Sequence, residues 1–219
     1  MKVVQNLVPS SKYNIKCPYS MTPEFIVVHN TANDASARNE IAYMIRNDNK
    51  VSFHYAVDDK EIIQGIPENR NAWHAGDGAN GQGNRKGLSI EICYSKSGGQ
   101  RFIEAEKLAT KFIAYKLKEK GWGIDRVKKH QDFSGKYCPH RTLDMGWQRF
   151  LDMVQTELDK LKGGVNVTQD KNQPSPWTKE AWEWAKKEGL TDGTRPKDAT
   201  TREEMVTLLH RYHKQVAQK

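Results

Sequence analysis

The feature that most restricts the fold of this 219-residue chain is an alternation of short apolar segments with amphipathic ones over residues 1–162. Residues 24–29 form a short apolar run rich in β-branched side chains, and residues 87–94 alternate apolar and polar side chains with a period of two, so both segments predict strands. Residues 102–120 and 142–161 carry apolar side chains at helical spacing. Further predicted elements are a helix at 36–47 and a hairpin formed by 52–57 and 61–66. This order predicts an α/β fold, in which a mixed β-sheet is flanked by helices.

A segment poor in large apolar residues interrupts this pattern at residues 163–174. Its Gly, Asn, Gln and Pro residues are typical of a linker. We therefore expect one domain at 1–162 and a small helical C-terminal domain at 175–219. Ser175 before Pro176 predicts the start of one helix, and 201–204 matches a capping box before a second. So small a core is marginal, and the domain is expected to pack on a partner, a second copy or the first domain.

The N-terminus does not predict an export signal. No long apolar run follows Lys2, and apolar stretches such as 25–28 are too short to cross a membrane. We expect a chain that is made in the cytoplasm and does not associate with membranes. Cys17, Cys93 and Cys138 are an odd number of cysteines, which favours ligand or buried-thiol roles over a disulfide framework.

The net charge of +8 arises from 35 Lys and Arg residues against 27 Asp and Glu residues. Such a charge suits a polyanionic partner, such as nucleic acid or a wall polymer, and it equally suits an ordinary basic surface. The sequence has no nucleic-acid-binding motif and no patch of interleaved arginine and aromatic residues. Binding of nucleic acid is therefore not expected.

Three side chains of metal-ligating type follow predicted strands. His29 ends the first strand, His130 follows a short β-like stretch, and Cys138 lies eight residues later in a loop that Gly135 can turn back. Two imidazoles and one thiolate leave the fourth position of a tetrahedral site open, which is the pattern of catalytic zinc. Spacing alone leaves a second interpretation open, in which the two histidines are core residues and the cysteine is a buried thiol.

Two further side chains are candidates for proton transfer and charge stabilisation. Glu91 lies on the polar face of the predicted strand 87–94, and Lys136 lies two residues before Cys138. A zinc hydrolase needs a group that accepts a proton from water and a cation that faces the oxyanion. Each residue also suits an ordinary role, as a solvated strand residue or a loop lysine.

Five segments then occur in a fixed order. They are 25–31 (FIVVHNT), 53–57 (FHYAV), 72–76 (AWHAG), 89–92 (SIEI) and His130 followed by 136–139 (KYCP). The pattern closely resembles the zinc-dependent N-acetylmuramoyl-L-alanine amidases. These are the type-2 amidases of phage endolysins and bacterial autolysins, related to peptidoglycan-recognition proteins. The resemblance extends over residues 23–150.

The resemblance implies a role for each matched residue. His29, His130 and Cys138 match the ligands of Zn²⁺. Glu91 matches the general base that acts on zinc-activated water, and Lys136 matches the lysine that stabilises the transition state. Relatives that lack the cysteine thiol commonly bind peptidoglycan without cleaving it, so its presence favours an active hydrolase.

Three more positions are compared with the family pattern. Trp73 and His74 match a motif that lines the substrate groove, where structural and binding contributions are not separated. Some relatives have a catalytic tyrosine at the position of Phe53. Because phenylalanine has no hydroxyl, that role passes to Glu91 or is absent here.

The implied activity is hydrolysis of the amide bond between N-acetylmuramic acid and L-alanine in peptidoglycan. The resemblance implies a bacteriolytic endolysin or autolysin that waits in the cytoplasm and acts on the cell wall after release. The alternative is a non-catalytic peptidoglycan-binding protein of the same fold.

The C-terminal segment carries a second resemblance. Residues 176–193 and 201–204 are similar to one S-layer-homology motif. Such modules attach proteins to secondary polymers of Gram-positive walls. The alternative is a helical hairpin that serves only homodimerisation or stability.

Overall fold

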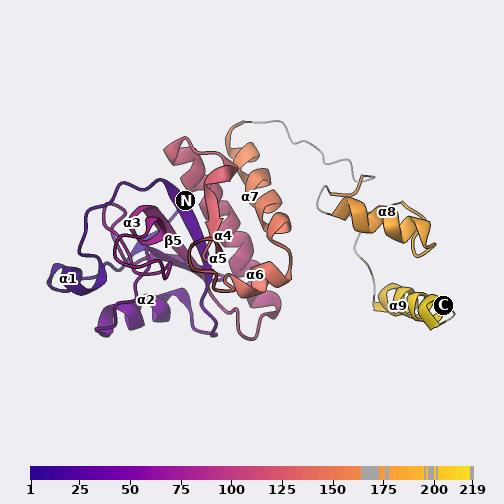
Figure 1. Ribbon diagram of the computed structural model, residues 1–219, viewed down its shortest axis with the longest axis horizontal. Helices are drawn as coiled ribbons and strands as arrows, with labels where there is room; N and C mark the ends of the chain where they lie inside the picture. Colours follow the sequence, from indigo (N-terminus) through magenta and orange to yellow (C-terminus); the bar gives the residue numbers. More distant parts are fainter. Residues whose placement is uncertain (164–172, 176–177, 195, 197–199, 201, 218–219) are drawn as a thin grey trace. The chain divides into compact units, whose positions relative to one another are not determined.

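The chain divides into two compact units, Met1–Gly163 and Gly164–Lys219, in the computed structural model (Figure 1). The predicted linker lies mostly outside the residues that the structure describes. The described residues are 1–163, 173–175, 178–194, 196, 200 and 202–217.

The first unit is built on a six-stranded sheet with the order β1-β4-β3-β5-β2-β6. The strands are β1 (Val4–Gln5), β2 (Phe25–Asn30), β3 (Tyr55–Val57), β4 (Ile62–Gln64), β5 (Gly87–Ile92) and β6 (Val127–Lys129). β3 and β4 pair antiparallel, and the other neighbouring strands pair parallel. The mixed sheet confirms the predicted fold class.

The first unit also contains helices, several of which pack on the sheet. They are α1 (Tyr13–Lys16), α2 (Ala37–Arg46), α3 (Gln82–Lys86), α4 (Gly99–Lys120), α5 (Gln131–Ser134), α6 (His140–Asp144) and α7 (Trp147–Leu161). α4 packs on α7 and on strands β3 and β5, while α2 packs on β3 and β4. Tyr55 of β3 contacts Phe112 of α4, so its register partner Ile90 shares the face that α4 covers. The residues that alternate with Ile90 along β5, among them Glu91, therefore face the opposite side of the sheet.

The register of the central strands positions two candidate residues. β2 and β5 pair in parallel register, which places His29 beside Glu91. Paired residues on neighbouring strands point to the same face of a sheet. The two side chains therefore leave the sheet together, close to the carboxyl ends of their strands.

Local signals predicted the longer helices. Ser36 caps α2, because its hydroxyl accepts a hydrogen bond from Asn39 N at 3.3 Å. Gly121 ends α4 in the left-handed conformation, with φ of 69°. The predicted hairpin is present, with shorter strands than expected. Its turn is closed by Asp58, whose carboxylate accepts the backbone N–H groups of Lys60 and Glu61.

The predicted single helix at 142–161 is wrong. The chain forms α6 and α7 there, and the break falls at Gly146, which has φ of 102°. L-residues rarely adopt that conformation, so glycine permits a sharp turn inside a segment whose apolar spacing is otherwise helical. α4 also begins three residues before its predicted start, because no apolar residue marks its first turn.

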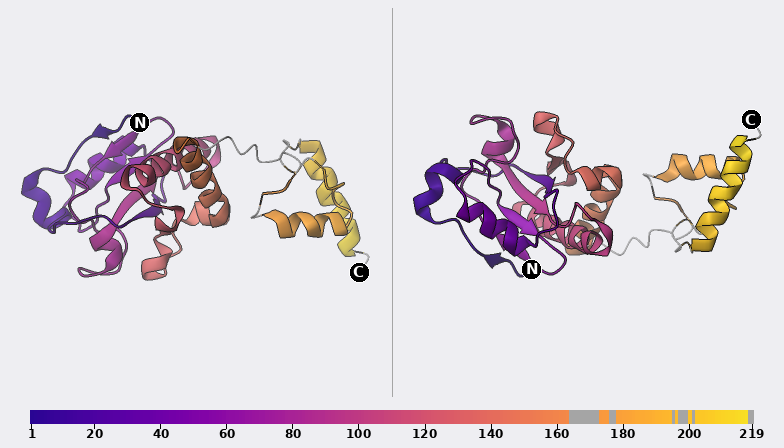
Figure 2. Two further views of the ribbon diagram at one scale, coloured as in Figure 1. Left: turned by 90° about the horizontal axis from the view of Figure 1, so that it is seen from above. Right: turned by 90° about the horizontal axis from the view of Figure 1, so that it is seen from below.

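The second unit contains α8 (Lys179–Lys187) and α9 (Arg202–Ala217) (Figure 2). Trp184 and Tyr212 meet edge to face, with ring centroids 6.0 Å apart. Pro176 and Thr201, which were predicted to begin the two helices, lie outside the described residues. Large apolar side chains of α9 stay exposed, among them Met205, Leu209 and Tyr212. Within the described residues, every helix is too short or too polar to cross a bilayer.

A charged cluster joins the β4–α3 connection to α4. Glu68 accepts hydrogen bonds from the Tyr55 hydroxyl at 2.7 Å and from Lys120 at 2.8 Å, and it pairs with Lys116 at 2.9 Å. Partial burial raises the pKa of Glu68, but the donors outweigh burial and lower this pKa to about 2. The pKa of Glu68 is lower in the folded protein than its ordinary value of 4.5. Its ionised carboxylate therefore stabilises the fold at pH values above 4.5, and this stabilisation is lost as the pH falls toward 2.

We expect Glu68→Gln to lower the free energy of unfolding by about 2 kcal/mol at neutral pH, a value between exposed and buried ion pairs. The variant should also lose the acid-dependent part of the stability between pH 4.5 and 2. Urea unfolding at several pH values measures both effects. Glu104→Gln is the control, because Glu104 forms an exposed pair with Lys107. Equal losses in the two variants would contradict the role of this cluster.

Candidate metal centre and groove

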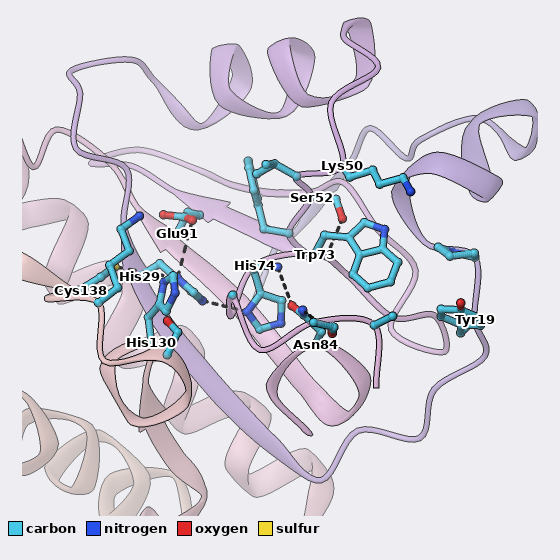
Figure 3. Close-up of a pocket in the computed structure, with 18 of the residues that line it drawn as sticks. Tyr19, His29, Lys50, Ser52, Trp73, His74, Asn84, Glu91, His130 and Cys138 are labelled. Atoms are coloured by element: carbon cyan, nitrogen blue, oxygen red, sulfur yellow. Dashed lines mark hydrogen bonds and ion pairs between the residues drawn. The ribbon is translucent and has the colours of Figure 1, made fainter. Parts of the chain in front are cut away.

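The three predicted metal ligands meet at one point (Figure 3). The Nδ1 atoms of His29 and His130 are 3.0 Å apart, and the sulfur of Cys138 is 3.9 Å from His29 Nδ1. The candidate donor atoms of all three residues lie within 4.8 Å of one another, and all three side chains are buried. This group could hold a metal ion.

The sheet and one glycine turn produce this convergence. β2 and β6 are parallel neighbours, so His29 and the residue that follows β6, His130, arrive at the same edge of the sheet. α5 then ends at Gly135, with φ of 75°. This turn brings the chain back, and Gln131 N donates to the carbonyl of Cys138 at 3.0 Å. The predicted role of Gly135 is confirmed.

Asn30 fixes the other side of the cysteine loop. Its Oδ1 accepts the backbone N–H groups of Arg141 and Thr142 at 3.0 and 3.2 Å, at the start of α6. Asn30 directly follows His29 on β2. The end of this strand therefore carries one candidate ligand, His29, and also the residue that holds the loop of a second candidate ligand, Cys138. Sequence reasoning missed this residue, although its position next to His29 was a usable signal.

The donor set fits a borderline-soft divalent metal. Burial, with the neighbouring His74, His130 and Lys136, holds the pKa of His29 well below its ordinary value, which keeps the imidazole neutral. Burial and Lys136 also lower the pKa of His130. Neutral imidazoles can donate a lone pair, and a set of two nitrogens and one sulfur suits zinc. Burial and Glu91 raise the pKa of the Cys138 thiol to about 11, and a bound cation would reverse that effect.

Glu91 lies at the edge of this group. Its Oε1 is 4.0 Å from His29 Nδ1, and its Oε2 is buried without a hydrogen-bond partner in the described part of the chain. Burial, reinforced by Glu40 and opposed by Lys136, raises the pKa of Glu91 to about 8. A carboxyl group that titrates so close to neutral pH can both accept and release a proton.

One groove of about 890 Å³ contains all seven predicted site residues. They are His29, Trp73, His74, Glu91, His130, Lys136 and Cys138. Lys136 is exposed, so its ammonium group is accessible from the groove. Phe53 also lines the groove and supplies no hydrogen-bonding group. The catalytic tyrosine of some relatives therefore has no counterpart at this position.

Trp73 forms part of the groove wall away from the candidate metal ligands (Figure 3). Its indole Nε1 donates to the carbonyl of Ile15 at 2.9 Å, and its backbone N–H donates to Ser52 Oγ at 2.9 Å. Tyr19 meets its ring edge to face at a centroid distance of 6.0 Å. These contacts hold the indole against the wall, so the residue has a structural role as well as lining the groove.

A buried lysine holds the rim beside Trp73. The ammonium group of Lys16 donates to Asn47 Oδ1 at 2.9 Å and to the carbonyls of Asn49 and Val51 at 2.6 and 3.2 Å. These bonds fix the loop that carries Lys50 into the groove. A fully buried lysine with several acceptors was not expected from the sequence, since lysine is usually exposed.

His74 differs from Trp73, because it contacts a candidate metal ligand. Its Nδ1 is 3.0 Å from Nε2 of His29, the nitrogen that faces away from the cluster. Asn84 of α3 accepts the backbone N–H groups of His74 and Ala75 at 2.8 and 2.9 Å. Nothing in the sequence pointed to Asn84, because α3 is short and polar and was not predicted.

Comparisons with known proteins show what this chain is similar to. A family model described as N-acetylmuramoyl-L-alanine amidase matches residues 19–141. The N-acetylmuramoyl-L-alanine amidase CwlA of Bacillus subtilis (strain 168) is 64% identical over 167 residues, which are 76% of this chain and 61% of that protein. XlyB of the same strain is 61% identical over 75% of this chain and 51% of its own length. The N-acetylmuramoyl-L-alanine amidase CwlA of a Bacillus species is 55% identical over 78% of this chain and 68% of its own length.

Solved structures share the fold. The structure of PlyL is 55% identical, with a TM-score of 0.69, and covers 70% of this chain and 97% of that one. The PlyG catalytic domain is 50% identical, also with a TM-score of 0.69, over 80% of this chain and all of that one. The catalytic domain of XlyA is 39% identical, with a TM-score of 0.65, over 70% of this chain and 99% of that one. The chain thus spans about half to two thirds of its curated relatives and almost the whole of these solved structures.

Proposed function

Because this chain belongs to the N-acetylmuramoyl-L-alanine amidase family, we propose that it hydrolyses the amide bond between N-acetylmuramic acid and L-alanine in peptidoglycan. The observation that carries this proposal is the set of side chains that line one groove. It is lined by a His–His–Cys cluster, by an accessible ammonium group, and by a carboxyl group whose buried oxygen has no hydrogen-bond partner among the described residues. These are the parts that a hydrolytic site needs.

The metal of this site would be zinc, held by His29, His130 and Cys138. Zinc bound there would polarise the scissile carbonyl and lower the pKa of a water molecule toward about 7. The two imidazoles are buried and their pKa values are lowered, so each neutral ring has one nitrogen lone pair to offer a metal ion. The donor atoms already lie within 4.8 Å of one another, so little rearrangement is needed.

Glu91 would move the proton. In the proposed reaction the oxygen of water bonds to the carbonyl carbon while Glu91 accepts a water proton. The carbon–nitrogen bond then breaks as Glu91 returns the proton to the departing amine of L-alanine. A cation held by the neighbouring ligands favours the ionised carboxylate, which counteracts the burial that otherwise raises its pKa. Lys136 would face the negative charge that develops on the carbonyl oxygen.

The non-catalytic alternative is less well supported. A protein that only binds peptidoglycan has no need of a complete ligand set or of a buried carboxyl group beside it. Here both are present, and burying Glu91 without a partner for Oε2 costs folding free energy. Such a cost is expected where a group is kept for chemistry rather than for stability.

Metal removal tests the proposed reaction. We expect a chelator to abolish the digestion of purified Gram-positive walls by the full chain and added Zn²⁺ to restore it. The amino acid at each newly released amino terminus should be L-alanine, because that residue is joined to the lactyl group. Full activity of the metal-stripped protein would contradict the zinc mechanism, and a different new terminus would contradict the assigned bond.

A second prediction concerns Glu91. Glu91→Gln should keep its bound zinc and lose at least about 100-fold in turnover, since the amide cannot accept the proton. The rate of amino-terminus release and the metal content of the same sample measure the two effects. Glu24→Gln is a matched control, because Glu24 pairs with Lys86 on the surface. An unchanged rate for Glu91→Gln would remove this residue from the reaction.

The C-terminal unit supports two proposals. As an S-layer-homology-like module, residues 175–219 would bind secondary wall polymers, consistent with a protein that is made in the cytoplasm and acts on the wall after release. As a helical hairpin, they would form a homodimer. A groove of about 790 Å³ between α8 and α9, lined by Trp182, Glu204 and Arg211 among others, suits a polar ligand. The exposed apolar residues of α9 suit a second copy.

Removal of this unit separates the two proposals. A protein that ends at Gly163 should cleave soluble muropeptides at the rate of the full chain and bind whole walls several-fold less tightly. Pelleting with purified walls measures the binding, and light scattering measures the oligomeric state. Undiminished wall binding together with a change from dimer to monomer would leave only the dimer proposal.

A further inference from the structure

A short segment, residues 73–76, lies behind both candidate histidine ligands. His74 Nδ1 is 3.0 Å from Nε2 of His29. The backbone of Ala75 hydrogen-bonds to the ring of His130. The position of a Cβ on Gly76 would be 3.6 Å from Nε2 of His130. The segment therefore meets the nitrogens that face away from the metal cluster.

This arrangement determines where the ring protons lie. An imidazole that coordinates through Nδ1 must carry its proton on Nε2, where it needs an acceptor. For His29 that acceptor is His74 Nδ1, so His74 must carry its own proton on Nε2. In this arrangement His74 offers its Nδ1 lone pair to His29. Nε2 of His74 is buried and has no hydrogen-bond partner in the described part of the chain.

The segment is itself fixed by α3. Asn84 is buried and accepts the backbone N–H groups of both His74 and Ala75. Its amide group donates to the Gly78 carbonyl at 3.0 Å, which prevents the side chain from turning over. Gly83 packs so closely that a Cβ there would lie 2.4 Å from that of Ala75. The acceptors behind the two ligands are thus held by a rigid frame.

We propose that His74 is a positioning residue that sets the tautomer and ring orientation of His29, with Asn84 holding the segment that supplies acceptors to both histidine ligands. The inference rests on the proposed zinc site and extends it to residues outside the ligand set. His74 acts through His29 and needs no contact with the reacting bond. Partners of this kind typically change metal affinity by about 10–100-fold.

Two substitutions at one position test the acceptor. His74→Ala removes it, whereas His74→Asn keeps an acceptor, because Oδ1 of asparagine sits close to the place of Nδ1. In the full-length chain, we expect His74→Ala to raise the zinc dissociation constant by about 10–100-fold and His74→Asn to raise it only a few-fold. Competition with a chromophoric chelator measures the constants. Trp73→Phe is the control, because Trp73 lines the groove without contacting a candidate ligand.

A second readout separates positioning from a purely structural role. The visible spectrum of the Co²⁺-substituted protein should shift in His74→Ala and return toward that of the unsubstituted chain in His74→Asn, while metal-free samples unfold at similar temperatures. Equal zinc affinity in His74→Ala and the unsubstituted chain would overturn the inference and leave the zinc site intact. An affinity in His74→Asn as weak as that of His74→Ala would also overturn it. Failure of the unsubstituted chain to bind zinc would overturn the proposed function itself.

Discussion

The parallel pairing of β2 with β5 and β6 is the constraint on which the rest of the site depends. It brings His29 beside Glu91, and it delivers His130 to the same edge of the sheet. β2 and β5 are buried along most of their length, so a one-residue slip between them would place apolar side chains in the groove and polar ones in the core. The hydrophobic packing that selects the register therefore also positions the chemistry.

The site places ionisable side chains in a buried environment, which disfavours their charged forms. Burial lowers the pKa of His29 and raises the pKa values of the Cys138 thiol and the Glu91 carboxyl group, so it disfavours the charged form of each group. A divalent cation reverses this preference for the thiol and the carboxyl group, because an opposite charge favours the ionised form. The same burial would make zinc affinity dependent on pH, since the ligands must lose protons to bind.

Residues outside the candidate ligand set hold the backbone segments that surround it. Asn30 holds the loop of Cys138 through the start of α6, and Asn84 holds the segment that faces both imidazoles. Both are buried amides whose oxygen accepts two backbone N–H groups. A buried amide that is satisfied in this way specifies one local backbone arrangement. Asn30 and Asn84 therefore fix the backbone around the groove, and neither needs to take part in the proposed reaction.

The amino-acid sequence by itself determined the fold class, most of the elements and the seven residues that line one groove. Those conclusions followed from local periodicity, from capping residues such as Ser36 and Gly121, and from the order of five short motifs. Only the tertiary structure decided the break at Gly146, the register that joins His29 to Glu91, and the contacts of Asn84 and His74. Contacts between residues far apart in the chain leave no local pattern, because a buried amide or a neutral imidazole acquires its partners only when the sheet and the loops have assembled.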